Sequence, residues 1–483
     1  MRVNEHVVAE NDSVAQQWLA LVASFDHLDA PRSRVEFIAA RYRKQPCRVV
    51  QRIQGAFNYC FRIRFDDAND EWIIRFPIPG YAMDPCRKTQ NEVDVMRFIQ
   101  SNTTIPIPKV FGSGVADGDF DGLGPYIVME YVHGLSLDDL ILENDEEWAL
   151  RKDCPAETIE KVYRQIACIY LQLFQHSFPK IGSLSAVDSD GVAPEWRLAL
   201  GPLTFKMNEV ERMGGVRIGA SDGPFDQTID YFQTLVDQSL SHLLHNPHAG
   251  RDEQEIQADR HSIDTLGSLA RHFSSKGNVE NQYRLFCDDL RFGNILVDES
   301  YQIVAVLDWE FCYVAPQSFL CSPPSWLIGT EPFEWKDDDV AYFTEKVGLF
   351  LSLLGEEEEK RDENDHRLSH LMRDSMRDGT FWFNLAIRES FPLSDIMSHC
   401  RNLEAFQNLT LYCGSSSDRK VTDKTPERQK WRAVDNSSLS PFLSTMWKSF
   451  RSSLPTIDRI SELLKSRGRS KDVHVGRNAD ERQ

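Results

Sequence analysis

The chain has 483 residues, of which 41% are hydrophobic and 11% aromatic, and a formal net charge of −20. This length predicts about two to three domains with ample core, and no apolar run approaches the roughly eighteen residues of a membrane span. The acidic balance argues against nucleic-acid binding, because clustered Lys and Arg hold phosphate backbones, and the first residues show no secretory or transit pattern, so we expect a cytoplasmic protein.

The net charge would suit a cationic small molecule. An acidic surface mainly keeps a protein soluble, however, so the charge alone selects no substrate. The ten cysteines form no Cys-x-x-Cys pair, and none stands at zinc spacing from a histidine, which favours reduced thiols in the core.

The first part of the chain changes from a helical to a β pattern. Residues 1–46 have the apolar faces of a helical N-terminal extension. Short β-branched or aromatic runs bounded by turn residues then predict strands at 48–53, 59–65, 72–76, 106–110 and 125–132. A helix is predicted at 89–100, where Val93, Met96 and Ile99 have helical spacing.

The second part is mainly helical in pattern. Apolar stripes predict helices at 156–175 and 225–244, and 340–410 is also helical apart from a charged run at 355–365. The stretches 185–223 and 246–262 are rich in Gly, Pro, Asp and His, which is typical of an insertion. Polar segments without periodicity flank one last apolar segment near 442–450.

Two short motifs carry candidate chemistry. The first begins at Cys287 and runs through Asp289 to Asn294, on a loop between two apolar runs, and the second places Asp308 at the end of the next apolar run. A hairpin at this point would bring the three polar side chains together. The alternative is an acidic hairpin whose Asp and Asn residues only form turns.

Phosphoryl transfer needs Mg²⁺ on the phosphates, an acceptor hydroxyl held in line, and positive charge around the transferred group. Asp289 is suited to take the acceptor proton. Asn294 and Asp308 offer the hard oxygen ligands that Mg²⁺ prefers. Arg291, two residues beyond Asp289, would reach the γ-phosphate.

These motifs resemble the kinase-like phosphotransferases, and more closely the aminoglycoside phosphotransferase family in the variety common in fungal proteins. That family's loop reads His-x-Asp-x-x-x-x-Asn, followed by Ile/Leu-Asp-Trp/Phe-Glu; here the second motif reads Leu307-Asp308-Trp309-Glu310. Cys287 replaces the histidine that braces the loop, which affects loop rigidity more than it removes a chemical group.

The resemblance covers about residues 48–350 and implies an α+β, two-lobed, protein-kinase-like fold. Residues 47–133 would form an N-lobe with a five-stranded antiparallel sheet and one helix. Residues 134–410 would form a mostly helical C-lobe with catalytic β-hairpins and an insertion at about 185–262. Residues 411–483 would form a polar linker, one helix and a mobile tail.

The resemblance also implies an ATP site. Arg75 takes the place of the kinase strand lysine, and an ion pair with Glu92 would hold it against the phosphates. Gly55 would allow a turn to cover the phosphates, and a hinge would bind adenine through the backbone of Glu130, Tyr131 and Val132. An ordinary hairpin turn at Gly55 and a buried core strand at the hinge remain alternatives.

A pocket for the acceptor is predicted less specifically. Trp309 and Trp326, with Glu310, would attract an amine through cation–π contact, although aromatic core packing is the commoner use of such residues. We therefore predict an ATP- and Mg²⁺-dependent phosphotransferase acting on a hydroxyl of a small molecule, with a cationic acceptor as one option.

Two alternatives remain. A catalytically weak pseudokinase that serves as a nucleotide-binding regulatory or interaction module is suggested by Cys287, by Arg75 and by the sparse glycine turn. A protein kinase fits less well, because Trp309 and Glu310 follow Asp308 where Phe-Gly is expected.

Overall fold

The computed structural model describes residues 3–24, 34–66, 70–116, 122–143, 149–189, 192–218, 223–250, 252–276, 283–361, 367–390 and 396–397. The linker, helix and tail predicted at 411–483 lie outside these residues. Across the described ranges, no helix is both long and apolar enough to cross a membrane.

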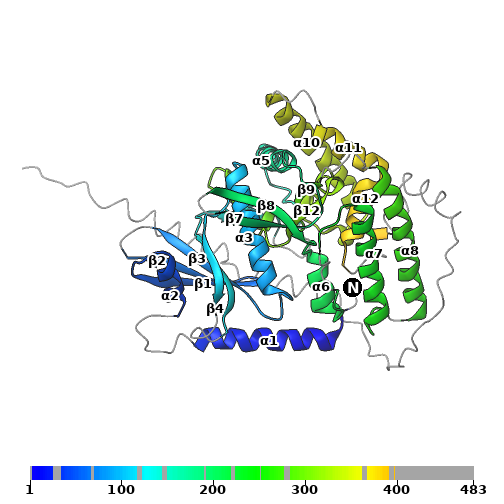
Figure 1. The fold of residues 1–483 in the computed structure, drawn as a ribbon. Helices are drawn as coiled ribbons and strands as arrows, with labels where there is room; N and C mark the ends of the chain where they lie inside the picture. The colour runs from blue at the N-terminus through cyan, green and yellow to red at the C-terminus, as the bar shows by residue number, and fades with distance from the viewer. Residues whose placement is uncertain are drawn as a thin grey trace, which may run out of the picture.

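Five antiparallel strands form a sheet in the order β1-β2-β3-β5-β4 (Figure 1). The strands are β1 Cys47–Gln54, β2 Asn58–Phe65, β3 Glu71–Pro77, β4 Val110–Ala116 and β5 Gly124–Glu130. Helix α3, Pro85–Asn102, packs on one face of this sheet. It begins sharply because the Asp84 carboxylate accepts the Arg87 N–H at 3.1 Å and Pro85 suits the first turn. The predicted N-lobe sheet and its helix are confirmed.

The fourth strand corrects the prediction of a strand at 106–110, because β4 starts where that segment ends. Pro106 and Pro108 have no N–H to donate, so their segment cannot form a regular ladder. Beyond them, Gly112 and Gly114 leave room for two tyrosines: an added Cβ would lie 2.0 Å from the Tyr42 ring at Gly112 and 2.8 Å from the Tyr126 hydroxyl at Gly114.

Helix α1, Glu5–Ser24, covers the other face of the sheet. Its Ala15, Trp18 and Val22 are buried against side chains that alternate along β2 and β3 and therefore share one face of those strands: Phe61, Ile63, Phe65, Trp72, Ile74 and Phe76. Helix α2, Arg34–Tyr42, adds Val35, Ile38 and Ala39 to the same cluster. The predicted helical N-terminal segment thus completes the sheet core.

The first half of α1 extends beyond the sheet to helix α6, Phe205–Gly214, as Figure 1 shows. The Asn4 N–H donates to the Met213 carbonyl at 2.7 Å, and the Asn11 side-chain amide donates to the Arg212 carbonyl at 2.8 Å. One helix therefore contacts both the sheet and the helical part of the molecule.

The C-lobe combines long helices with short antiparallel strand pairs, β12 with β9 and β10 with both β11 and β6. Its helices include α5 Ala156–Phe174, α7 Thr228–His245, α8 Glu253–Lys276, α10 Asp337–Lys360, α11 Arg367–Asp378 and α12 Thr380–Arg388, with short α4 Leu137–Ile141 and α9 Gln317–Leu320. Its strands are β6 Leu135–Ser136, β7 Ser183–Ser189, β8 Val192–Leu200, β9 Tyr283–Cys287, β10 Ile295–Val297, β11 Ile303–Val306 and β12 Cys312–Pro316. The predicted mixed α+β fold, with a five-stranded antiparallel sheet followed by a mostly helical part, is confirmed.

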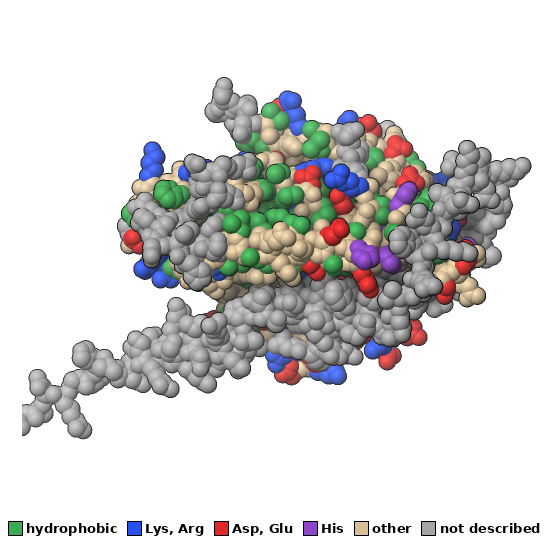
Figure 2. Space-filling model, turned by 90° about the horizontal axis from the view of Figure 1, so that it is seen from below, with side chains coloured by type: hydrophobic (Ala, Val, Ile, Leu, Met, Phe, Trp, Pro, Cys, Tyr) green, Lys and Arg blue, Asp and Glu red, His purple; other side chains and the backbone are tan. Residues whose placement is uncertain are grey.

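The predicted insertion is more regular than its composition suggested. Segment 185–223 contains most of the β7–β8 hairpin and α6, and α8 already begins inside the stretch 246–262. Helix α8 forms because the Asp252 carboxylate accepts the Glu255 N–H at 2.9 Å and because Ile263 and Leu266 are buried at helical spacing. On the face shown in Figure 2, acidic and basic side chains are interspersed over the described part.

Candidate active site

The first motif folds into a tight loop between β9 and β10, closed by a 3-10 turn at Phe292–Asn294. Asn294 Nδ2 donates to the Asp289 carbonyl at 2.6 Å and to the Asp289 carboxylate at 3.4 Å. The Leu307 N–H in turn donates to the Asn294 carbonyl at 2.7 Å. The structure therefore brings Asp289, Asn294 and the residue before Asp308 together, as the predicted hairpin requires.

Asp308 has an unusual backbone conformation. It follows β11 with φ of 55°, in the left-handed region that side-chain-bearing residues seldom adopt. Such positions tend to gather where function requires a particular side-chain direction. The Asp308 side chain is 33% exposed and accepts a hydrogen bond from Arg75.

Arg75 bridges the two lobes. One of its terminal nitrogens donates to Glu92 on α3, and the other donates to Asp308 in the C-lobe. Burial alone would lower the pKa of Arg75, but the Glu92 and Asp308 carboxylates outweigh it and raise that pKa. The Arg75–Glu92 ion pair predicted from the sequence is present, and a guanidinium can bind two carboxylates at once where an ammonium acts as a point charge.

Asp289 is paired with Arg291, whose Nε lies 3.1 Å from Oδ1. Each of these side chains is 15% exposed. Burial raises the pKa of Asp289 to about 6, against the lowering effect of Arg291 and with a further increase from Glu310 and Asp308. A carboxylate with a pKa close to neutrality is well suited to general-base chemistry.

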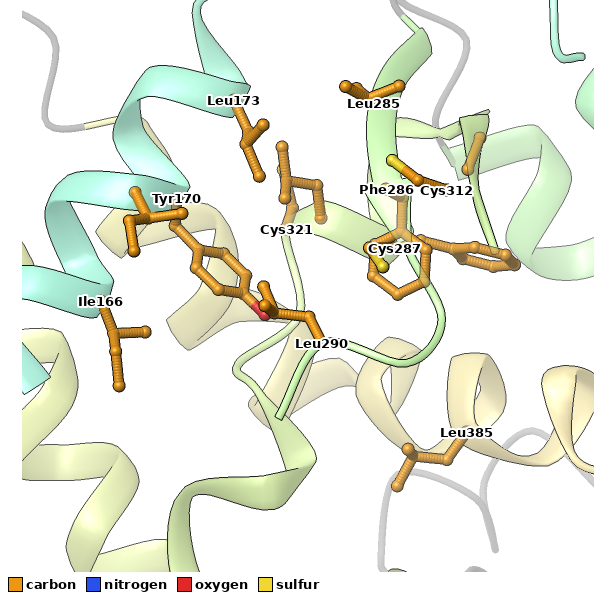
Figure 3. Packing of buried hydrophobic residues seen from close by; sticks show 14 of the residues in the cluster. Ile166, Tyr170, Leu173, Leu285, Phe286, Cys287, Leu290, Cys312, Cys321 and Leu385 are labelled. Atoms are coloured by element: carbon orange, nitrogen blue, oxygen red, sulfur yellow. The ribbon is translucent and has the colours of Figure 1, made fainter. Parts of the chain in front are cut away.

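Cys287 lies behind the loop, 7% exposed, in the hydrophobic cluster with Tyr170 and Leu290 (Figure 3). Its thiol lies 3.8 Å from the Asp308 carbonyl, to which it donates a weak hydrogen bond. The pKa of Cys287 is raised by its interaction with Cys312 and by burial. Cys287 therefore still connects the two motifs, through a weaker donor than a histidine.

The turn between β1 and β2 is narrow, because the Gly55 N–H donates to the Asn58 carbonyl at 2.7 Å. A Cβ at Gly55 would lie 3.3 Å from that carbonyl oxygen, closer than most real Cβ contacts. The turn is thus an ordinary hairpin turn in geometry.

At the predicted hinge, two backbone amides already have partners. The Glu130 N–H donates to the Lys109 carbonyl and the Tyr131 N–H to the Glu71 carbonyl, both at 2.9 Å. Within the part of the chain that the structure describes, the Val132 N–H and the Tyr131 carbonyl have no hydrogen bond. These two backbone groups therefore remain available to a ligand.

Two side-chain oxygens are candidate ligands for a divalent cation. Because Asn294 Nδ2 donates to Asp289, the Asn294 Oδ1 is left without a hydrogen-bond partner among the described residues. The partly exposed Asp308 carboxylate is the second candidate ligand. The described ranges hold no group of three or more His, Cys, Asp or Glu suited to a metal, but Mg²⁺ needs only one or two carboxylates when phosphates and water complete its shell.

Two of the three residues predicted to line an acceptor pocket, Trp309 and Glu310, are buried in the structure. Trp309 is 1% exposed, and its Nε1 donates to the Val306 carbonyl at 3.1 Å. Glu310 is also 1% exposed and is bound by Lys88. Trp326 is half-buried and packs edge-on against Phe292. Trp309 and Glu310 therefore do not fit the wall of an open pocket, because internal partners occupy both side chains.

Glu331 was not predicted by sequence reasoning. It precedes a short 3-10 turn and interacts electrostatically with Arg291 and Asp289. Burial raises the pKa of Glu331 to about 7, against the effect of Arg291 and with a further increase from Glu389. No motif marks Glu331, since only the tertiary fold brings it to the loop.

The profile of the phosphotransferase enzyme family matches residues 50–319, more than half of the chain. No curated protein matches the sequence.

Solved structures also resemble the chain, at low identity. A thermostable mutant of aminoglycoside phosphotransferase APH(4)-Ia, in ternary complex with AMP-PNP and hygromycin B, has 14% identity and a TM-score of 0.38, covering 80% of this chain and 100% of that chain. An ethanolamine kinase from Plasmodium vivax has 13% identity and a TM-score of 0.39, covering 77% of this chain and 82% of that chain.

Proposed function

The chain belongs to the phosphotransferase enzyme family, and from this premise we propose that it is an ATP- and Mg²⁺-dependent enzyme that transfers the γ-phosphate to a hydroxyl group of a small molecule. The observation that carries the proposal is the meeting of five side chains from four segments. Asp289 and Asn294 are hydrogen-bonded in one loop, while Arg75 joins Glu92 on α3 to Asp308.

In the proposed reaction, the acceptor oxygen forms a bond to the γ-phosphorus while the bond from that phosphorus to the bridging oxygen breaks, and ADP leaves. Asp289 orients the hydroxyl and takes its proton as charge develops. Arg75 and Arg291 bring positive charge to the phosphates. Bound Mg²⁺ would be held by Asn294 and Asp308 and would neutralise phosphate charge.

For the nucleotide, we propose that the turn at Gly55 covers the phosphates. The Val132 N–H and the Tyr131 carbonyl would bind the adenine edge, since the amides of Glu130 and Tyr131 are already used within the sheet.

We further propose a cationic acceptor. The support is electrostatic: Glu331 lies near Asp289, and Glu389 adds a like charge that raises the pKa of Glu331 further. A positively charged group beside these carboxylates would relieve their mutual repulsion.

A second candidate is a nucleotide-binding regulatory module with weak catalysis. It is favoured by the direct contact of Arg75 with Asp308, because a guanidinium on that carboxylate competes with a cation. It is also favoured by the thiol at position 287, which replaces a stronger hydrogen-bond donor.

Thermal melting tests the nucleotide binding that both candidates share, and its dependence on a metal ion. A ligand that binds only the folded chain stabilises it by about 2.7 kcal/mol at a hundredfold excess over its dissociation constant. We expect Mg-ATP to raise the melting temperature more than ATP with a chelator does. The absence of any shift with either ligand would contradict nucleotide binding.

Activity is then tested with a panel of amine-bearing and neutral alcohols, by measuring ATP consumption. The Asp289→Asn variant is the control, because loss of a general base costs about 10²–10⁴ in rate. ATP binding without turnover of any alcohol would favour the regulatory module. Turnover that persists in Asp289→Asn would exclude the assigned base.

A further inference from the structure

A buried ionic cluster lies next to the candidate active site, and its members have no part in the proposed phosphoryl transfer. Lys88 Nζ on α3 lies 2.5 Å from Glu310 Oε2. The Asn58 side-chain amide, at the start of β2, donates to the same carboxylate oxygen at 2.8 Å and accepts from Lys88 Nζ at 3.2 Å. Three segments far apart in the sequence therefore meet in one closed set of polar contacts.

The cluster is removed from water. The Lys88 and Glu310 side chains are each 2% exposed, and Asn58 is 8% exposed. Burial alone would raise the pKa of Glu310, but Lys88, followed by Arg75, outweighs it and lowers that pKa. The Lys88 ammonium also lies 5.8 Å from the centre of the Phe311 ring, within cation–π range.

A buried ion pair is weak evidence for stability, because desolvation can cost as much as the charges gain. Its better-supported use is to specify one arrangement of the groups it joins. The Lys88–Glu310–Asn58 cluster would therefore fix the arrangement of the segments that carry its three members.

Each member stands beside a residue of the proposed reaction. Asn58 directly follows the turn at Gly55. Lys88 lies one helical turn before Glu92, the partner of Arg75. Glu310 lies two residues after Asp308. The rings of Phe57 in the turn and Phe311 beyond Glu310 also meet edge-on, with centres 6.3 Å apart.

We propose that Lys88 and Glu310 are positioning residues that lock the Gly55 turn, α3 and the Asp308 segment into one unit, so that the phosphate-covering turn and the proposed cation ligand keep a fixed relation. This inference rests on the proposed function. Lys88 and Glu310 act through their neighbours, and neither touches a reacting atom.

The test measures nucleotide binding and requires no knowledge of the acceptor. Titration calorimetry of the full chain would compare Mg-ATP with metal-free ATP for the wild type, Lys88→Met, Glu310→Gln and the double variant. We expect each single variant to bind Mg-ATP about 10- to 100-fold more weakly, as when the groups that orient metal ligands are lost. Binding of metal-free ATP should fall less. The double variant should bind no more weakly than the worse single variant, because both changes break the same contact.

A matched control is Glu358→Gln. Glu358 is another buried carboxylate, 1% exposed, which accepts from the Ser369 hydroxyl at 2.6 Å in the contact between α10 and α11. Its loss should lower the melting temperature and leave the affinity ratio for the two ATP forms unchanged. Asn58→Ala removes only a neutral member of the cluster, so it provides the same test if Lys88→Met does not fold.

The outcomes separate the two levels of inference. If the wild type binds Mg-ATP and the cluster variants bind it equally well, or lose both ATP forms to the same extent, the positioning role is wrong and the proposed function stands. If the wild type binds neither form, the proposed function fails, and the positioning role fails with it.

Discussion

Replacing Asp289 by Asn is expected to change activity and stability in opposite directions. The raised pKa of Asp289 means that the folded chain holds this proton more tightly than the unfolded chain does. Above both pKa values the ionised carboxylate therefore costs folding free energy, and below the unfolded value that cost disappears. The shift from 3.8 to about 6 corresponds to about 3 kcal/mol, at roughly 1.36 kcal/mol for each pKa unit.

The assay is urea unfolding of both proteins in the presence of a chelator, at several pH values. Asp289→Asn should be more stable than the wild type by up to about 3 kcal/mol at neutral pH. The difference should shrink as the pH falls through 6 and approach zero below 3.8. In the Asp289→Asn variant, the rate of phosphotransfer should fall by about 10²–10⁴ relative to the wild type.

Asp298→Asn is the matched control. Hydrogen bonds from Gln302 and Ser300 lower the pKa of this exposed carboxylate, so its neutral replacement should not stabilise the fold. If Asp289→Asn were destabilising at neutral pH, or if its gain in stability were the same at every pH, then the ionised carboxylate would not be destabilising the folded loop. Asp289 would then be a structural turn residue.

Three further changes test other parts of the structure. Burial and Lys206 lower the pKa of His242 to about 4, so the free energy of unfolding of the wild type should fall by up to about 3 kcal/mol as the pH drops from 6.5 through 4. The His242→Gln variant should not show this fall in urea unfolding. The same pH dependence in both proteins would contradict a neutral, buried His242. Trp18→Ala should lower the free energy of unfolding by about 3–5 kcal/mol in the same assay, because Trp18 is only 6% exposed and packs on the sheet. Unchanged stability would contradict the packing of α1 on the sheet. Arg75→Lys keeps the charge but cannot bind two carboxylates as a fork, so calorimetry should show weaker Mg-ATP binding by a folded chain; unchanged affinity would argue against a phosphate role.

Local patterns in the sequence predicted much of the fold. Strands β1, β2, β3 and β5 lie within a few residues of the predicted ranges, as do helices α3, α5 and α7. These elements were predictable because the period of buried positions is a local property of the chain. The predicted strand at 106–110 failed because its prolines outweighed its apolar residues.

The sequence by itself determined that the two candidate motifs meet, since Asp289 and Asn294 precede the short β10–β11 hairpin and Asp308 follows it. The Arg75–Glu92 pair was predicted through the family resemblance rather than from spacing, and the structure contains it. Only the tertiary structure decided that Lys88 binds Glu310, that Glu331 lies near Asp289, and that Trp309 is in the core. Such contacts join segments dozens to hundreds of residues apart, so they depend on how whole elements pack, which no local spacing of residues encodes.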